Sequence, residues 1–192
     1  MKHIYLLLVS VITLADFASA QNPKVEITTT LGTIELEIFK DKAPITANYF
    51  LENVNNNVFK DACVYRVVRM DNQPNNDIKI EVIQGGLFFD SIVDQKPAIA
   101  HETTKETGIL HTDGVISMAR NQPGSASTEF FICIGDQPNL DFEGMRNPDG
   151  QGFAAFGKVI KGMDVVKLIQ QQKDDEQMLV ERIDILSITR IQ

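Results

Sequence analysis

The sequence is poor in the side chains that most often carry covalent or metal-based chemistry. It contains two cysteines, three histidines and no tryptophan among 192 residues. It also lacks the short signatures of a phosphate-binding loop, a dinucleotide fold, a zinc protease and an α/β-hydrolase. The motifs therefore give no support to an activity that depends on a nucleotide, a metal or a nucleophilic serine.

Positive charge is scarce as well. Eighteen Lys and Arg stand against 26 Asp and Glu, so the formal net charge is −8. An acidic surface repels a polyphosphate backbone, and no local cluster of Lys or Arg reverses the sign. We therefore expect no nucleic acid among the partners of this protein.

Long apolar runs are confined to the start of the chain. After Lys2, the segment 4–15 is apolar, and Ala-Ser-Ala follows at 18–20. This is the layout of a secretory signal peptide with its cleavage site. A membrane anchor is the alternative, but the run is shorter than the roughly 20 residues that a spanning helix needs. We expect cleavage of residues 1–20 and a single exported domain at 21–192, periplasmic or secreted, without membrane attachment.

The two cysteines lie far apart in the chain. Cys63 and Cys133 are 70 positions apart, each among apolar residues. An exported protein is able to join such residues, but one pair does not amount to a disulfide framework. We expect two buried free thiols, with a disulfide as the alternative.

Hydrophobic alternation predicts about eight short strands. Ile34, Leu36 and Ile38 alternate with polar residues, and Leu31-Gly32 supplies the turn of a β-hairpin over 25–39. The other strands are expected at 62–70, 78–86, 115–120, 129–134, 153–160 and 181–191.

Two isolated amphipathic helices accompany the strands. One begins at Pro44 and ends near Asn55, and the other extends from Met163 to Gln170. The polar segment 71–77 is typical of a loop, and 87–112 is expected to be mostly irregular connection. Because no alternation of strands and helices is present, we predict an all-β fold, an antiparallel sheet that curls or closes, with helices over its ends.

Histidine offers two candidate sites. His101 and His111 lie near acidic residues, but a zinc site needs a third ligand at recognisable spacing. His111, Asp113 and Ser117 contain the residue types of a hydrolase triad, although nothing in the sequence places the hydroxyl beside the imidazole. Structural or loop histidines are the interpretation we prefer.

One arginine and one pair of aromatics raise a different possibility. Arg66 lies within the apolar strand VYRVV, and an arginine is almost never fully buried without a partner. It therefore faces solvent or lines an open groove. Phe130 and Phe131 are neighbours in EFFICI, and neighbouring strand residues point to opposite faces. One of them can fill a core while the other serves elsewhere.

Taken together, these segments resemble the cyclophilin family of peptidyl-prolyl cis/trans isomerases. The motifs are VYRVV, VIQGG, SMAR followed by TEFFICI, NLD and FAAFGKVIKGMDVV, and the likeness covers about residues 24–191 in the family's order. The resemblance implies a closed eight-stranded antiparallel β-barrel capped by two α-helices, with the active site in a groove outside the barrel. It also implies a monomer that needs no cofactor and acts on proline-containing polypeptides.

The matching motifs imply roles for individual residues. Arg66 matches the catalytic arginine, and Gln84 matches the glutamine that holds the substrate backbone and the arginine. Tyr65 and Glu129 stand where the family usually has histidine and glutamine beside the peptide. The proline pocket and the remaining peptide contacts are expected at Val82, Met118, Ala119, Phe131, Leu140 and Phe153, with Phe130 inside the barrel.

The chain also departs from the family pattern. Seventeen residues separate Arg66 from Gln84, which indicates an insertion at about 69–79. Glu81 falls where the family has a pocket phenylalanine, so either the pocket is shallower or the strand has a shifted register. Asn139 replaces the aromatic residue at the pocket mouth.

Rotation about an Xaa-Pro bond breaks no σ bond, so the lack of a nucleophile agrees with isomerase activity. We therefore expect a peptidyl-prolyl isomerase that assists the folding of exported proteins. A catalytically weak proline-peptide-binding module, or holdase, on the same fold is the first alternative. A secreted hydrolase on an unrelated β fold is the second.

Overall fold

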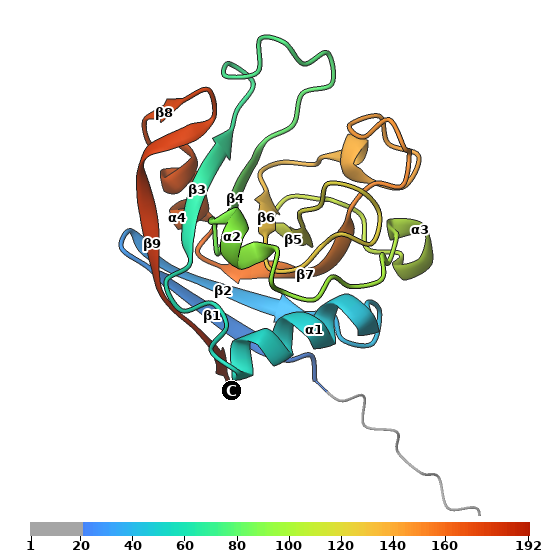
Figure 1. Ribbon diagram of the computed structural model, residues 1–192, viewed down its shortest axis with the longest axis vertical. Coiled ribbons are helices and arrows are strands. Elements are labelled where there is room, and N and C mark those ends of the chain that lie inside the picture. The colour runs from blue at the N-terminus through green and yellow to red at the C-terminus, as the bar shows by residue number, and fades with distance from the viewer. Residues whose placement is uncertain (1–20) are drawn as a thin grey trace, which may run out of the picture.

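The chain folds as an antiparallel β-barrel in the computed structural model, which describes residues 21–192 (Figure 1). Neighbouring strands follow the order β1-β2-β7-β5-β6-β4-β3-β9, and β1 also pairs with β9, so eight strands form a closed ring. The two-residue β8 extends the sheet beside β9. The predicted all-β fold is therefore confirmed. The strands are β1 (Lys24–Thr29), β2 (Gly32–Ile38), β3 (Cys63–Val68), β4 (Val82–Gly86), β5 (Val115–Met118), β6 (Phe130–Cys133), β7 (Ala154–Lys161), β8 (Asp174–Asp175) and β9 (Met178–Ile191).

Both predicted helices are present. The first is α1 (Pro44–Asn55), which has Pro44 in its first turn and lies along the lower end of the barrel in Figure 1. The second is α4 (Met163–Gln170), which contacts β2, β3 and β4. Together they cover the two ends of the barrel, as a closed sheet with an apolar interior requires.

The segment 87–112 is more ordered than predicted. It contains two single-turn helices, α2 (Asp90–Val93) and α3 (Thr104–Thr107). Thr103 and Glu106 form a reciprocal capping box at the start of α3. Such a motif satisfies the free backbone N–H groups of the first turn. It requires no hydrophobic periodicity, so periodicity alone does not predict this helix.

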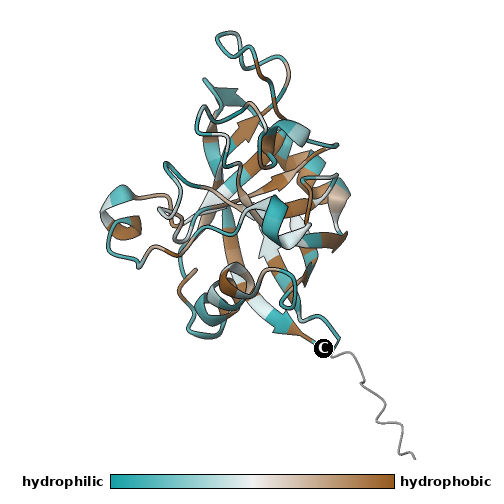
Figure 2. Cartoon of the chain, turned by 90° about the vertical axis from the view of Figure 1, so that its right-hand side faces the viewer, coloured by the Kyte–Doolittle hydropathy of each residue, from teal (hydrophilic) through white to brown (hydrophobic). Residues whose placement is uncertain are grey.

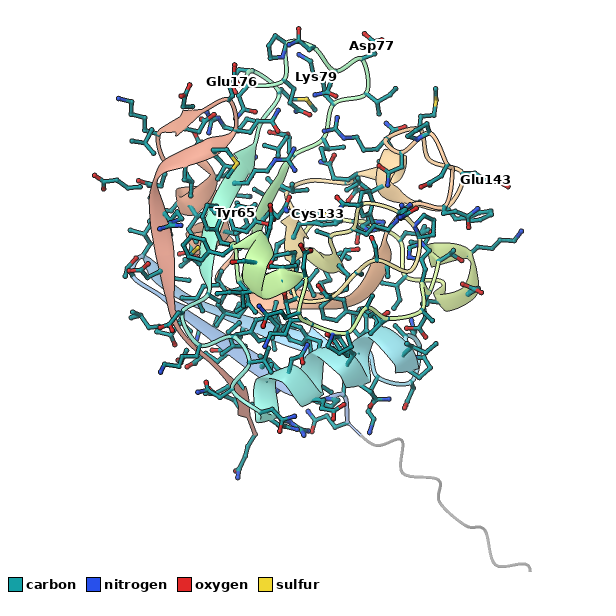
Figure 3. The ribbon with its side chains drawn as sticks, viewed as in Figure 1. Tyr65, Asp77, Lys79, Cys133, Glu143 and Glu176 are labelled. Carbon is teal, nitrogen blue, oxygen red and sulfur yellow. The ribbon has the colours of Figure 1, made fainter. Side chains whose placement is uncertain are left out.

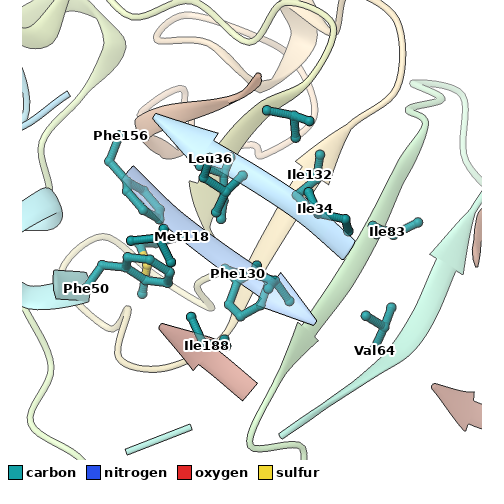
Figure 4. Close-up of a cluster of buried hydrophobic side chains, with 14 of the residues drawn as sticks. Ile34, Leu36, Phe50, Val64, Ile83, Met118, Phe130, Ile132, Phe156 and Ile188 are labelled. Atoms are coloured by element: carbon teal, nitrogen blue, oxygen red, sulfur yellow. The ribbon is translucent and has the colours of Figure 1, made fainter. Parts of the chain in front are cut away.

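The barrel interior holds the main hydrophobic core. Ile34, Leu36 and Ile38 are buried in it, as their alternation predicts. In Figure 4 the rings of Phe50 from α1 and Phe130 from β6 lie within this cluster. Their centroids are 6.1 Å apart with nearly perpendicular planes, a preferred geometry for aromatic pairs. Figure 2 shows apolar residues concentrated on the strands.

A second, smaller apolar cluster lies apart from this core. It consists of Val68, Ile80, Val82, Phe131, Cys133 and Leu140. Because Phe130 belongs to the main core and Phe131 to the small cluster, β6 places its two adjacent aromatics on opposite faces. The barrel wall therefore carries an apolar patch on the face opposite its core.

The insertion forms a loop at one end of the barrel, at the top of Figure 1. Strand β4 begins at Val82 rather than at 78, because the buried side chain of Gln73 bonds both the N–H and the C=O of Ile80. These backbone groups are therefore satisfied within the loop instead of in the sheet.

No helix within residues 21–192 combines the length and apolar character that crossing a bilayer requires. The predicted signal peptide, residues 1–20, lies outside the described part of the chain.

Candidate active site

Arg66 lies at the junction of three strands. In the sheet it is paired with Gln84 of β4 and with Met178 of β9. Its Nη1 donates a hydrogen bond to Gln84 Oε1 at 2.9 Å. Partial burial lowers the pKa of Arg66, but an arginine side chain in a protein stays protonated. The predicted pair Arg66 and Gln84 is thus brought into direct contact.

A residue that the sequence did not indicate holds the other side of the guanidinium. Gln177, in the turn between β8 and β9, accepts hydrogen bonds from Arg66 Nε at 3.2 Å and from Nη2 at 2.6 Å. It is 111 residues away from Arg66 along the chain, so no local pattern could reveal the contact. The register of β3 with β9 alone brings the two together.

A hydrogen-bond chain continues from Gln84 through two further predicted residues. Gln84 Nε2 donates to the Tyr65 hydroxyl at 2.7 Å, and that hydroxyl donates to Glu129 Oε2 at 2.6 Å. Glu129 Oε1 in turn accepts from the backbone N–H of Leu87 at 2.7 Å. Burial raises the pKa of both Tyr65 and Glu129. The phenol therefore stays protonated and acts as the donor in this chain.

An open cavity of about 270 Å³ adjoins Arg66. Its apolar wall includes Phe131 and Phe153, whose rings meet edge to face with centroids 5.2 Å apart. The guanidinium of Arg66 and the amide of Gln84 form part of the polar wall. Three of the residues expected in the proline pocket, Val82, Ala119 and Leu140, line the same cavity.

A second cavity of about 230 Å³ adjoins the first. Tyr65 and Glu129 line it, and Gln84 and Ala119 are shared by both cavities. Apart from Met118, the predicted site residues therefore divide between two adjoining cavities with Gln84 at their boundary.

Met118 is a correction to the predicted pocket. It is paired with Phe130 across β5 and β6, and directly paired residues share one face of a sheet. Because Phe130 faces the barrel interior, Met118 does too, and it belongs to the main core (Figure 4). Its neighbour Ala119, just beyond the end of β5, is the one that reaches the cavity.

Glu81 does not take the place of the family's pocket phenylalanine, and the strand register beside it is regular. Ile80 lines the cavity, whereas the Glu81 carboxylate accepts a long bond of 3.5 Å from Gln170 of α4. Ile80 is two residues before Val82 and four before Gln84, so it shares their face by the ordinary period of an extended chain. That spacing was a readable signal for Ile80.

Arginine side chains form two supports that the sequence analysis missed. Arg120 makes a two-point ion pair with Asp149 at 2.8 and 2.9 Å and lies 5.2 Å from the ring centroid of Phe153. It also donates to the C=O of Gly152. Arg146 lines the cavity near Arg66 and donates to the C=O of Ile78 at 2.6 Å. Both fix loops that carry pocket walls.

The residue types of the alternative hydrolase triad do come together, but with a different acid and in the protein interior. His111 Nε2 lies 2.9 Å from Ser117 Oγ, and His111 Nδ1 lies 2.8 Å from Asp141 Oδ1. Asp113 instead accepts from the N–H of Gly135. Ser117 is 0 % and His111 1 % exposed, so no substrate reaches the hydroxyl. His111 stacks on Phe131 with centroids 5.8 Å apart, and this group therefore supports the cavity floor.

The second candidate histidine, His101, also has a structural contact. His101 Nε2 lies 3.1 Å from the C=O of Gln151. Within residues 21–192, no three His, Cys, Asp or Glu side chains gather as a metal site would need.

Comparison with known proteins agrees with this geometry. The profile of the cyclophilin type peptidyl-prolyl cis-trans isomerase family matches residues 24–190. The peptidyl-prolyl cis-trans isomerase of Acinetobacter baylyi is 38% identical over 149 residues, which cover 77% of this chain and 72% of that protein. Peptidyl-prolyl cis-trans isomerase B of Escherichia coli is 33% identical over 147 residues, covering 72% and 79%.

A solved structure shows the same fold. The crystal structure of a cyclophilin type isomerase from Cryptosporidium parvum superposes with a TM-score of 0.70 at 19% identity, covering 89% of this chain and 98% of that one. Since the family profile spans almost all of the described chain and the bacterial relatives exceed 30% identity, this chain belongs to the cyclophilin-type peptidyl-prolyl cis-trans isomerases.

Proposed function

We propose that this protein catalyses cis/trans rotation of Xaa-Pro bonds in polypeptides and that Arg66 is its catalytic residue. The observation that carries the proposal is the place of the guanidinium, in the polar wall of an open cavity of about 270 Å³ whose apolar wall includes Phe131. A proline ring suits the apolar wall, and the peptide bond before it then lies next to the charged edge.

The reaction requires only that the site stabilise the twisted peptide bond. Partial double-bond character gives the Xaa-Pro bond a barrier of about 18–20 kcal/mol, and twisting the bond localises a lone pair on the proline nitrogen. An N–H of Arg66 that donates to this nitrogen stabilises the twisted imide more than the planar one. That difference is what lowers the barrier, and no covalent intermediate is required.

The neighbouring residues complete the proposal. Gln84 bonds Arg66 through its oxygen and Tyr65 through its nitrogen, so its amide is fixed and is able to orient both the arginine and the substrate backbone. Val82, Leu140 and Phe153 wall the proline pocket, and Ala119 offers backbone groups to the peptide. Tyr65 and Glu129 would contact residues on the other side of Gln84.

The partners and the compartment are inferred from the sequence. The signal-like segment 1–20 supports export to the periplasm or the medium, where newly translocated chains with slow Xaa-Pro bonds are the clients. We propose a monomer. A related cyclophilin from Cryptosporidium parvum has been crystallised in the presence of the dipeptide Ala-Pro, which supports proline-containing peptides as ligands.

An exchange assay separates an isomerase from a binding module. Magnetisation exchange between the cis and trans forms of a short Xaa-Pro peptide is recorded with and without the protein, and peptide affinity is measured separately. The proposal predicts acceleration by the wild-type protein at catalytic concentration. Binding without acceleration would favour the holdase alternative.

A further inference from the structure

The guanidinium of Arg66 donates hydrogen bonds to two glutamines, Gln84 and Gln177. It has five N–H groups. Among residues 21–192 three of them are used, Nε–H and one Nη2–H by Gln177 and one Nη1–H by Gln84. One N–H on each terminal nitrogen remains for a substrate. The two glutamines thus set which donors are free and in which plane they lie.

We propose that Gln177 is a positioning residue for Arg66 and that the β3–β4 loop, residues 69–81, which contains the insertion, holds Gln177 in place. This inference rests on the proposed function of Arg66. It assigns a role to two features, the β8–β9 turn and the insertion, that neither the motifs nor the family likeness explains.

A hydrogen-bond donor on one side and an acceptor on the other fix the orientation of the Gln177 amide. Its Oε1 accepts both bonds from Arg66, and its Nε2 donates to the C=O of Asn72 in the inserted loop at 3.2 Å. In the flipped orientation, N–H groups would face N–H groups and two carbonyl-type oxygens would face each other. The loop carbonyl therefore locks the acceptor oxygen toward the guanidinium.

The backbone of this turn is strained. Glu176 has φ 48° and Gln177 has φ 76°, both in the left-handed region that favours glycine. A two-residue hairpin turn of this kind usually has Asn-Gly. The backbone of Gln177 is held by bonds from its N–H to Asp174 Oδ2 at 3.0 Å and from Val67 N–H to its C=O at 2.8 Å. A side chain kept at a position suited to glycine points to a function for that side chain.

Asp174 fastens the inserted loop to the turn. Its Oδ2 also accepts from Asn72 Nδ2 at 2.9 Å, and its Oδ1 accepts from Arg69 Nη2. The Asp174 side chain is only 6% exposed. Figure 3 shows Glu176 of the turn at the same end of the molecule as Asp77 and Lys79 of the loop. The chain between Arg66 and Gln84 is thus tied to the turn that carries Gln177.

The consequence for catalysis is preorganisation. With Gln84 alone, the guanidinium has a single contact about which it can rotate, whereas the contacts of Gln177 at Nε and Nη2 fix its plane. Donors that are already aimed at the reacting atom need no reorganisation during the reaction. Loss of Gln177 should therefore lower kcat, while the apolar pocket and hence KM stay nearly unchanged.

The test replaces two neighbouring residues of the same turn in the full-length mature protein. Gln177→Gly and Glu176→Gly both relieve a left-handed φ, so Glu176→Gly should leave the Tm equal to wild type or higher, whereas the three side-chain hydrogen bonds lost in Gln177→Gly offset part of that gain. Only Gln177→Gly should lower kcat, by about tenfold with KM within about twofold, the loss expected for a donor that is misdirected rather than removed. A Gln177→Gly protein that is folded and retains full kcat would overturn the inference.

A double variant tests the role of the loop. Asn72→Ala removes the side-chain bonds from Asn72 to Asp174 and to the C=O of Val67, so it should lower kcat less than Gln177→Gly does. If the Asn72 side chain affects Arg66 only through the position of Gln177, its removal has no further effect once Gln177 is absent. The Asn72→Ala/Gln177→Gly protein should therefore be no slower than Gln177→Gly alone. Additive losses would show that the loop acts independently of Gln177.

Failure of this inference and failure of the proposed function are distinguishable. If Arg66→Ala abolishes exchange and Gln177→Gly does not affect it, only the positioning role is wrong. If Arg66→Ala has no effect, the proposed function itself is wrong.

Discussion

At the scale of single residues, the shape of the site depends on which of two adjacent side chains faces it. Alternation predicts that Phe130 and Phe131 diverge, but it cannot say which one enters the barrel. The family likeness supplied that choice and the two apolar clusters confirm it. The same likeness misplaced Met118, because position within a motif does not state the face, whereas pairing with Phe130 does.

Replacement of the two phenylalanines should separate stability from binding. Phe130→Ala should lower the free energy of unfolding by about 3–5 kcal/mol, as for other buried phenylalanines, and leave the KM of the folded fraction unchanged. Phe131→Ala should raise KM because it opens the floor of the pocket. Urea unfolding and the exchange assay measure the two effects. An unchanged KM for Phe131→Ala would remove this residue from the substrate site.

Glu129 should make stability depend on pH. Burial raises its pKa in the folded state, so its contribution to stability is complete below its unfolded pKa of about 4.3 and is lost as the pH rises through the folded pKa. The free energy of unfolding of wild type relative to Glu129→Gln should therefore decline as the pH rises above about 4. Urea titrations at several pH values test this. Parallel curves for the two proteins would contradict the raised pKa.

At the scale of elements, the predictable parts are those with a strong period. The first hairpin, α1 and α4 form where the sequence places them. The single-turn α3 was missed because one turn is too short to show a period, although Thr103 and Glu106 match the spacing of a capping box. The contact between the inserted loop and the β8–β9 turn had no local signal, because it joins residues about 100 positions apart.

The loop that carries Phe153 offers a test at this scale. Arg120 lowers the pKa of Asp149 to about 2, and the N–H of Gln151 adds to this shift. A lowered carboxyl pKa contributes stability above the unfolded pKa of about 3.9 and loses it as the pH falls through the folded pKa. The Tm difference between wild type and Asp149→Asn should be constant above about pH 5 and shrink toward pH 3. Because the pair lies near the surface, salt should reduce it as well. A difference that grows in acid would contradict this assignment.

At the scale of the whole molecule, closure of the sheet accounts for both the core and the site. A barrel buries one face of every strand and leaves the other available, and here β3, β4 and β6 carry the small apolar cluster and the polar groups on that second face. The composition and alternation of the sequence predicted an antiparallel sheet that curls or closes, and the family likeness supplied the closed barrel. They could not predict Gln177, because its place depends on the register of β3 with β9.

The barrel also decides the state of the cysteines, which are both buried and free. Cys63 pairs with Gly86 and Cys133 with Val82, on opposite sides and at opposite ends of β4. Two strand spacings alone separate them by about 9.5 Å, beyond the Cα distance that a disulfide spans. We predict that a thiol reagent labels both residues only after unfolding and that reductant leaves the Tm unchanged. A fall in Tm with reductant would indicate a bond.

The most direct test of the central claim is the exchange rate of a bound Xaa-Pro peptide on wild type, Arg66→Ala and Arg66→Lys, measured by NMR together with peptide affinity. Removal of the guanidinium should slow exchange by about 10²–10³-fold, comparable to the loss of an aimed donor in other enzymes, with affinity within a few-fold of wild type. Lys keeps the charge but lacks the planar fork that both glutamines hold, so Arg66→Lys should be only slightly faster than Arg66→Ala. Exchange at the wild-type rate on Arg66→Ala would contradict the account.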